Sequence, residues 1–267
     1  MIVETADRSH TDAYKLLIGA VVPRPIAWVS TIDDSGRLNL APFSFFQGVC
    51  PDPPTVIVSV GRRADGERKD TALNALATGQ FVVNIVNLAL AEPMNQSSSD
   101  YPYGMSEFEM AGLATAPSHL VAPPRVAEAP IALECRLSQT LELGRSPHDY
   151  LLLFGEVVCF YVRDDLYDNG RINQEILQPL GRLAGNQYSK PGEIFELIRP
   201  KYEAPGGYAC SSTTACASRR RPSTPPTARS DCTSAASPPT TPPTSATPSP
   251  TLFSTCWAAT CADTASA

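Results

Sequence analysis

A group of basic residues lies directly before a predicted helix, and its position is suited to binding an anion. The helix is expected over 72–77, with Asp70 or Thr71 as its N-cap and Gly79 at its end. Four cations precede it: Arg62, Arg63, Arg68 and Lys69. Because the amino end of a helix has unpaired N–H groups and a partial positive charge, phosphate is a natural ligand there. A plain helix cap beside a solvated lysine fits the same local pattern.

A second candidate is the stretch 39–44, in which a predicted strand loses its alternation. Residues 26–32 favour a strand, and the turn at 33–36 would lead the chain back as the next one. Pro42 has no N–H to donate to a neighbouring strand, so it usually marks a bulge or a sheet edge. Backbone groups near Pro42 are therefore expected to face something other than a strand.

Few side chains in this sequence could perform chemistry by themselves. It lacks Gly-x-Ser-x-Gly, His-Glu-x-x-His and a Walker loop, and residues 181–185 do not have the Rossmann glycine spacing. The histidines His10, His119 and His148 are far apart in the chain, and none has an evident acid or cysteine partner. The sequence therefore predicts no metal site and no catalytic side chain. A cofactor would have to carry the difficult step of any reaction.

Several motifs, in this order and spacing, resemble the flavin reductase-like family of FMN-binding split-barrel proteins, which includes flavoredoxins. They are Arg-Pro-Ile-Ala-Trp-Val-Ser-Thr (24–31), Asn-Leu-Ala-Pro-Phe-Ser-Phe-Phe (39–46), Asp-Pro-Pro (52–54), Lys-Asp-Thr (69–71), Phe-Val-Val-Asn-Ile-Val (81–86), Phe-Gly-Glu-Val (154–157) and Gly-Arg-Leu-Ala-Gly-Asn-Gln-Tyr (181–188). One such motif is weakly specific, whereas this many in register are strongly specific. The resemblance covers residues 10–200.

The resemblance implies FMN as the cofactor and a set of residues that contact it. Those expected at the isoalloxazine and ribityl parts are Thr31, Asn39, Ala41, Pro42, Phe43 and Ser44. Those expected at the phosphate are Ser59, Arg63, Lys69, Asp70 and Thr71. The resemblance also implies a homodimer with one FMN per subunit near the interface.

The activity implied by the resemblance is hydride transfer from NADH or NADPH to flavin, as in the reductase component of a two-component monooxygenase. Hydride passes directly from nicotinamide to flavin, so the protein supplies orientation, exclusion of water and electrostatics. Two alternatives stay open. One is a flavoredoxin-like electron-transfer protein with tightly bound FMN, and the other is a non-catalytic flavin-binding module.

Six predicted strands must position these residues. They cover 26–32, 39–44, 55–60, 80–87, 131–143 and 149–162. The run 55–60 reads as a strand buried on both faces, and 131–143 alternates so that Ala132 and Glu134 would face outward. Helices are too few for a βαβ repeat, which leaves an antiparallel barrel or sandwich. The family resemblance favours a mainly β fold with a few helices, built as a six-stranded antiparallel Greek-key split barrel.

The chain of 267 residues divides by composition. Residues 1–206 have the mixed composition of a globular domain, and the resemblance implies that this is a flavin reductase-like FMN-binding domain. Residues 207–267 form a low-complexity tail rich in Ser, Thr, Ala and Pro. From Tyr208 onward there is no Lys, Glu, Ile, Val or Gly, so the tail cannot bury enough apolar surface to order its backbone. We expect it to be disordered. A GC-rich gene read in a shifted frame would give this composition, so we hypothesise a frameshift near Gly206.

The net charge and the lack of a long apolar run point away from two classes of partner. The formal charge is −6, and because the tail holds more Arg than Asp, the folded part is more acidic than the whole chain. An acidic body argues against nucleic acid as the main partner. No apolar run approaches the roughly 20 residues of a membrane span. We therefore expect a cytoplasmic protein.

Overall fold

The computed structural model describes residues 1–99, 101–102 and 105–202. The chain separates into a unit at Met1–Arg199 and a second at Pro200–Ala267, and the first holds all the helices and strands described below. The predicted domain boundary between residues 206 and 207, the tail beyond it and its expected disorder lie outside the described residues.

Seven strands form one antiparallel sheet in the order β3-β2-β6-β9-β10-β5-β4. They are β2 (Ala27–Ile32), β3 (Leu38–Phe43), β4 (Phe46–Pro51), β5 (Pro54–Gly61), β6 (Gln80–Ile85), β9 (Ile131–Leu143) and β10 (Tyr150–Val162). After β3 the chain crosses to β4 and β5 at the far side of the sheet, and it then returns to β6 beside β2. The predicted antiparallel Greek-key connection is confirmed.

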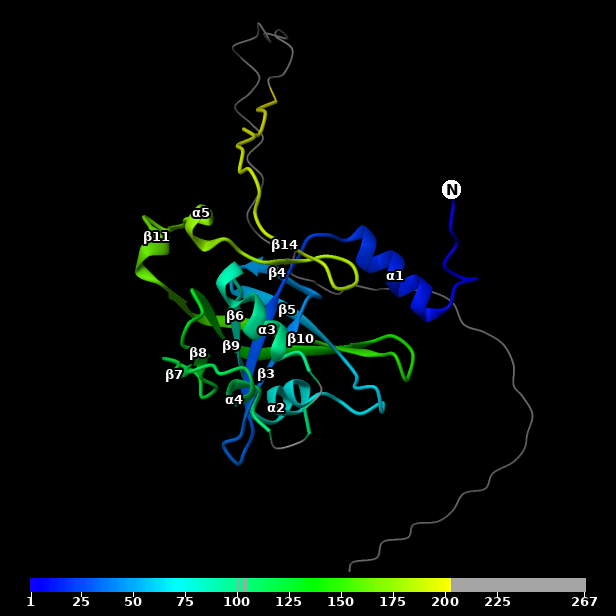
Figure 1. Ribbon diagram of the computed structural model, residues 1–267, viewed down its shortest axis with the longest axis horizontal. Coiled ribbons are helices and arrows are strands. Elements are labelled where there is room, and N and C mark those ends of the chain that lie inside the picture. Colours follow the sequence, from blue (N-terminus) through cyan, green and yellow to red (C-terminus); the bar gives the residue numbers. More distant parts are fainter. Residues whose placement is uncertain (100, 103–104, 203–267) are drawn as a thin grey trace, which may run out of the picture. The chain divides into compact units, whose positions relative to one another are not determined.

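The sheet curves around one apolar core, so that β3 approaches β5 and a split barrel results (Figure 1). Val29, Val58, Phe81 and Leu153, from four different strands, are fully buried within it or nearly so. Gly155 of β10 faces the same core, and a Cβ atom there would lie 2.4 Å from Phe81 Cζ. A glycine is required at this position because the backbone of β10, which bulges here, passes directly over the Phe81 ring.

Strand β4 is the element that the sequence prediction omits, so the sheet has seven strands rather than six. It pairs with β5 as the last strand of the sheet. Its residues are mostly exposed and include Gly48 and Pro51, so neither alternation nor strand propensity indicates it. The pairing with β5 determines its conformation.

Helices surround the sheet: α1 (His10–Ala20), α2 (Asp70–Thr78), η1 (Leu88–Leu90), α3 (Ala91–Gln96), α4 (Glu107–Met110), η2 (Asp164–Leu166) and α5 (Gln174–Leu177). Helix α2 ends at Gly79 with φ 68°, as predicted, but its N-cap is Lys69 rather than Asp70 or Thr71. Both α2 and α4 pack against β3, which places their amino ends near the strand that carries Pro42 (Figure 1).

Short strands complete the fold. β1 (Arg24–Pro25), β13 (Gly181–Arg182) and β14 (Tyr188–Ser189) form a three-stranded sheet, β7 (Thr115–Ala116) pairs with β8 (Arg125–Val126), and β11 (Tyr167–Asp168) pairs with β12 (Arg171–Ile172). The three-stranded sheet joins the motif at 24–31 to the motif at 181–188.

Two strands differ from their predicted burial. In β5 the alternate valines are buried and the residues between them are half-buried, so one face rather than both faces the core. In β9, Ala132 and Glu134 are buried rather than exposed. The segment around residue 120 covers this face, and the Glu134 carboxylate accepts the N–H groups of His119 at 2.7 Å and Leu120 at 2.6 Å.

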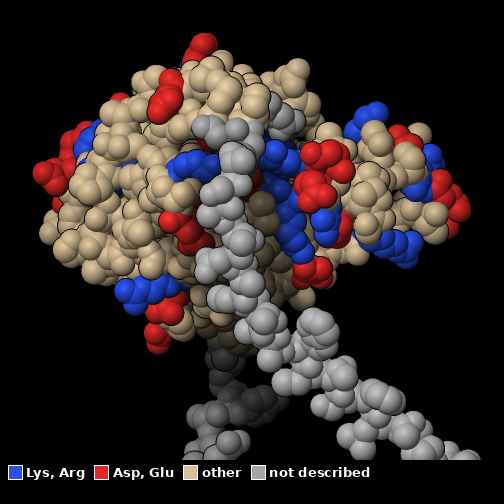
Figure 2. Space-filling model, turned by 90° about the horizontal axis from the view of Figure 1, so that it is seen from below, with Lys and Arg blue, Asp and Glu red and all other residues tan. Residues whose placement is uncertain are grey.

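The surface carries both signs of charge. On the face drawn in Figure 2, Lys and Arg side chains lie close to Asp and Glu side chains in several places, with broad uncharged areas between them. Among the described residues, no helix combines the length and the apolar character needed to cross a bilayer.

Candidate functional site

Strand β3 lies at one edge of the sheet, so one side of its backbone does not pair with β2. The Leu40 N–H points to that free side and donates to Glu107 Oε2 at 2.9 Å. Backbone directions alternate along a strand, so the nitrogen of Pro42 points the same way as that of Leu40. Proline is tolerated because no hydrogen bond to β2 is lost. The predicted edge position is confirmed, and the carbonyl groups of Leu40 and Pro42 also face the free side.

Four polar side chains tie β2, β3 and α2 together behind this edge. Asn39 Nδ2 donates to Thr71 Oγ1 at 2.8 Å and to Thr31 Oγ1 at 3.3 Å. Asn74 Nδ2 donates to Thr31 Oγ1 at 3.1 Å. Asn39, Thr31 and Thr71 are buried, so these bonds satisfy groups that water does not reach. The network fixes the first turn of α2 against the two strands.

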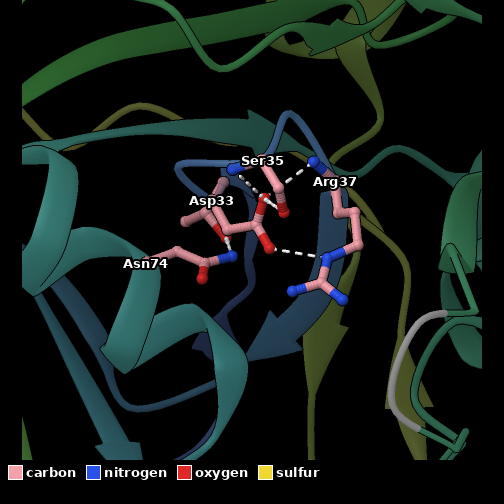
Figure 3. A network of polar contacts seen from close by, with 5 residues as sticks. Asp33, Ser35, Arg37 and Asn74 are labelled. Carbon is pink, nitrogen blue, oxygen red and sulfur yellow. Dashed lines mark hydrogen bonds and ion pairs between the residues drawn. The ribbon is translucent and has the colours of Figure 1, made fainter. Parts of the chain in front are cut away.

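The turn between β2 and β3 is held by its own carboxylate (Figure 3). Asp33 accepts the Arg37 N–H and the Ser35 hydroxyl, and it pairs with the Arg37 guanidinium at 2.7 Å. These hydrogen bonds, led by the one from the Arg37 backbone, hold the pKa of Asp33 below its ordinary value. Asn74 reaches from α2 toward the same turn. The turn therefore sets the register of the hairpin that carries the edge strand.

A cavity of about 70 Å³, called here the narrow cavity, opens between β3 and the start of α2. Eight of the predicted FMN contacts line it: Asn39, Ala41, Pro42, Phe43, Arg63, Lys69, Asp70 and Thr71. Helix α2 begins at Asp70, and the first N–H groups of a helix have no partner within it. Backbone donors and cations thus meet in one small space, as an anionic ligand requires.

The charges in the narrow cavity are partly compensated. Arg63 pairs with Asp70 at 2.6 Å. Lys69 has no carboxylate within ion-pair distance in the part of the chain that the structure describes. Glu107 also lines the cavity, and burial raises the pKa of its carboxyl group. Lys69 is therefore the cation best placed to pair with a ligand.

A second cavity of about 690 Å³, called here the wide cavity, adjoins the narrow one. The two share Pro42, Phe43 and Ser98 as lining residues. Its volume falls in the range of about 300–1,000 Å³ that is usual for small-molecule sites. Its other walls come from α1, α3 and the β1–β13–β14 sheet, through Tyr14, Ile18, Arg24, Met94, Asn95, Arg182 and Tyr188.

The predicted contacts fall into three groups: those that line the narrow cavity, one that lines only the wide cavity, and two that line neither. Eight belong to the first group, and Ser44 lines the wide cavity. Thr31 is fully buried beneath Asn39, so its hydroxyl holds Asn39 and Asn74 in place from behind. Ser59 lies half-buried on β5, where its N–H donates to the Phe45 carbonyl, and it lines neither cavity.

Sequence reasoning missed Tyr14 and Arg24 as lining residues of the wide cavity. The available signal was a charged residue between two prolines, Pro23 and Pro25, at the start of a strand. Arg24 is only 5% exposed, and a buried arginine usually serves a specific partner.

Two histidines that are distant in the sequence meet near this cavity. The rings of His10 in α1 and His148 in the β9–β10 hairpin stack with centroids 4.0 Å apart. Tyr14, one turn further along α1, lies 6.4 Å from the Phe45 ring. These contacts hold α1 where Tyr14 and Ile18 can line the wide cavity.

The residues present fit a flavin mononucleotide in kind. The narrow cavity offers Lys69, helix N–H groups and Thr71 to a phosphate. The wide cavity offers Phe43, Tyr14 and the outward Pro42 carbonyl group to a flat ring. A ligand with an anionic tail and a planar heterocycle would place one part in each.

Comparison with known proteins identifies the family. A model of the family described as "Flavin reductase like domain" matches residues 19–179. An uncharacterized protein of Halalkalibacterium halodurans is 45% identical over 196 residues, which is 72% of this chain and 93% of that protein.

Two solved structures are similar over nearly their whole length. Nitrilotriacetate monooxygenase component B from Bacillus cereus is 42% identical with a TM-score of 0.71, covering 74% of this chain and 98% of its own. The 2-nitrobenzoate 2-nitroreductase NbaA of Pseudomonas fluorescens is 33% identical with a TM-score of 0.69, covering 78% of this chain and 100% of its own.

Proposed function

Because this chain belongs to the flavin reductase-like domain family, we propose that it binds FMN and transfers hydride from NADH or NADPH to flavin. The observation that carries the proposal is the junction of the two cavities at Pro42 and Phe43. A narrow cationic space opens there into a wide space with aromatic walls. This shape matches a phosphate joined to a planar ring system.

In this proposal Lys69, Thr71 and the first N–H groups of α2 bind the phosphate. Arg63 holds Asp70 at 2.6 Å and so keeps that carboxylate from approaching the anion. Asn39 positions Thr71, and Thr31 positions Asn39. The outward carbonyl group of Pro42 accepts a hydrogen bond from the ring edge. We keep Ser59 as a phosphate contact on the ground of the family resemblance.

The protein's part in the reaction is to orient two rings and exclude water. When bound, FMN supplies the hydride-accepting ring, so no protein side chain has to react covalently. Phe43 and Pro42 form the wall against which a ring can lie, and Tyr14 and Ile18 of α1 close the opposite side of the wide cavity. Holding donor and acceptor in contact is worth several powers of ten in rate.

We also propose the setting in which this activity operates. The similarity to nitrilotriacetate monooxygenase component B favours a reductase that delivers reduced flavin to a separate monooxygenase. We propose a homodimer in the cytoplasm. The dimer is supported by α1, which bounds the wide cavity on one side and whose Leu16 and Leu17 side chains are about half exposed. A second copy would cover those side chains.

The test is spectroscopic. Purified protein saturated with FMN should show a flavin absorbance band, and anaerobic stopped-flow mixing with NADH or NADPH should bleach it faster than it bleaches free FMN. Bleaching at the rate of free FMN by both donors would overturn the reductase proposal. Tight FMN binding with bleaching only by a protein electron donor would instead favour the flavoredoxin-like alternative, and binding without any reduction would favour a flavin-binding module.

A second candidate function is direct reduction of a small acceptor inside the wide cavity. It is favoured by the 33% identity to a 2-nitrobenzoate 2-nitroreductase over that enzyme's full length. Under this candidate reduced flavin stays bound and the acceptor enters the cavity. Turnover of a nitroaromatic acid by NADH without any added monooxygenase would distinguish it from flavin delivery.

A further inference from the structure

Two arginines face each other across the short β1–β13 pair. Arg24 and Arg182 are Cα partners in that register, and both line the wide cavity. Directly opposed residues project to the same face of a sheet, where like charges repel. No Asp or Glu lines the cavity, and in residues 1–99, 101–102 and 105–202 no carboxylate pairs with either guanidinium. Two positive charges therefore share one cavity without an anion.

Arg24 is fixed rigidly in this position. Its Nη1 donates to the carbonyl groups of Ile18 and Val21, each at 2.7 Å, and its Nη2 donates to Leu183 O at 2.9 Å. Its Nε donates to Ser44 Oγ at 3.4 Å. These neutral oxygens satisfy its N–H groups but do not neutralise its charge. Burial, with the positive charge of Arg182 as a smaller cause, lowers the pKa of Arg24 from its ordinary value.

Arg182 is held more loosely and keeps donors free. Its Nη2 donates to Gly185 O at 2.6 Å, and its guanidinium lies 4.4 Å from the centre of the Tyr188 ring. A guanidinium has five N–H groups in a planar fork that matches the two oxygens of a carboxylate or phosphate. Arg182 thus has both the donors and the orientation, set by Tyr188, to bind an oxyanion.

We propose that Arg24 and Arg182 form an anion subsite in the wide cavity, and that it holds the carboxylate or phosphate group of the second substrate. An oxyanion there would relieve the repulsion between the two arginines. The proposal rests on the proposed function for the flavin ring nearby, whereas the subsite itself requires only the cavity and the two guanidinium groups. Its ligand is either an aromatic acid, as acceptor, or the diphosphate of a nicotinamide dinucleotide, as donor.

The test is calorimetric titration of the full-length, FMN-saturated protein with three probes. Benzoate and benzamide have nearly the same shape and differ in charge, and inorganic pyrophosphate represents the dinucleotide. We expect benzoate or pyrophosphate to bind at least about tenfold more tightly than benzamide, because hydrogen bonds to charged groups exceed neutral ones. The R182Q variant should lose about tenfold for the anion and leave benzamide unchanged, and R182K should recover part of the loss. The matched control is R171Q on the exposed β12.

The outcomes separate cleanly. Selective, Arg182-dependent binding of benzoate supports the subsite and assigns it to an acceptor, and the same result with pyrophosphate assigns it to the donor. Equal binding of benzoate and benzamide, with no Arg182-dependent pyrophosphate binding, overturns the subsite. FMN content is measured on each variant, and if wild-type protein binds no FMN the titration is run without it. The subsite and the FMN proposal therefore fail independently.

Discussion

The narrow and the wide cavity share a wall but differ in how their charge is arranged. In the narrow cavity, two cations stand beside two carboxylates, Asp70 and Glu107, and Arg63 already pairs with Asp70. In the wide cavity, two arginines stand without any carboxylate. The pairing of Arg63 with Asp70 leaves one cation and a helix end for the phosphate of the proposed flavin. The two unpaired arginines of the wide cavity are left for the anionic group of the proposed second substrate. Four variants can break or sharpen this contrast.

The largest effect is expected from Lys69→Met, which removes the unpaired cation of the narrow cavity. FMN binding should weaken by about 1.5–3 kcal/mol, the usual worth of a hydrogen bond to a charged group. Titration of apoprotein with FMN measures it. R182Q is the matched variant in the wide cavity and should leave FMN affinity within about threefold, or about 0.6 kcal/mol. Similar losses in both variants would mean that the two cavities do not divide the ligand as proposed.

Next is Asn39→Ala, which removes the side chain that joins Thr31 to Thr71. The Thr71 hydroxyl would be left buried without its 2.8 Å partner, so the free energy of unfolding should fall by about 1–3 kcal/mol. FMN binding should weaken as well, because the start of α2 is released. Urea unfolding and FMN titration measure the two effects. Asn74→Ala, which loses only the bond to Thr31, should cost less on both scales.

Glu107→Gln tests how much a partly buried carboxylate lowers the free energy of unfolding, by comparing the variant with wild type at two pH values. The pKa of Glu107 is raised in the folded protein, chiefly by burial, so the folded state binds its proton more tightly than the unfolded state does. The charged carboxylate therefore lowers the free energy of unfolding of the wild-type protein at pH values above the folded pKa. This loss of stability disappears as the pH falls below the ordinary pKa of glutamate. The variant should be more stable than wild type near about pH 8 and equal to it near about pH 3.5.

Urea unfolding at the two pH values checks this, with Glu109→Gln, an exposed neighbour in the same helix, as control. An advantage of Glu107→Gln that is the same at both pH values would contradict the assignment. The variant should also bind FMN somewhat more tightly at neutral pH, since one negative charge leaves the narrow cavity.

The smallest effect is expected from His10→Ala, which removes the ring stacked on His148. An exposed aromatic pair contributes about 0.5 kcal/mol, so global stability should change little. Hydrogen exchange of the α1 amides should become faster. The affinity of the wide cavity for benzoate should fall by more than the affinity for FMN does. His119→Ala, whose ring has no aromatic partner in the described residues, should leave α1 exchange unaltered.

The sequence predicts the narrow cavity better than the wide one, for a physical reason. Lys69, Asp70 and Thr71 are contiguous and stand at a helix start, so their local pattern already makes an anion a candidate ligand beside the plain helix cap. The wide cavity is assembled by pairing Arg24 with Arg182 and by stacking His10 on His148, contacts between residues far apart in the chain. Strand β4 escaped prediction for the same reason, because its conformation depends on β5 rather than on its own residues.

The burial of a side chain was likewise predictable only where the sheet itself determines it and no separate segment covers that face. The alternation of β9 predicted its inner face correctly, but the covering of Glu134 by backbone N–H groups of residues 119 and 120 depends on a connection with no periodic signal. Pro42 was informative because proline constrains the backbone whatever its surroundings.

The position of Pro42 has one more consequence, for solubility at high concentration. An outermost strand invites strand-by-strand polymerisation, since its unpaired amides are a template for another chain. On β3 that template is interrupted: Pro42 offers no amide, and the Leu40 amide is already taken by a side chain. The edge position of β3 leaves the Pro42 carbonyl open to a small molecule, and the missing Pro42 amide hinders the addition of another strand at this edge of the barrel.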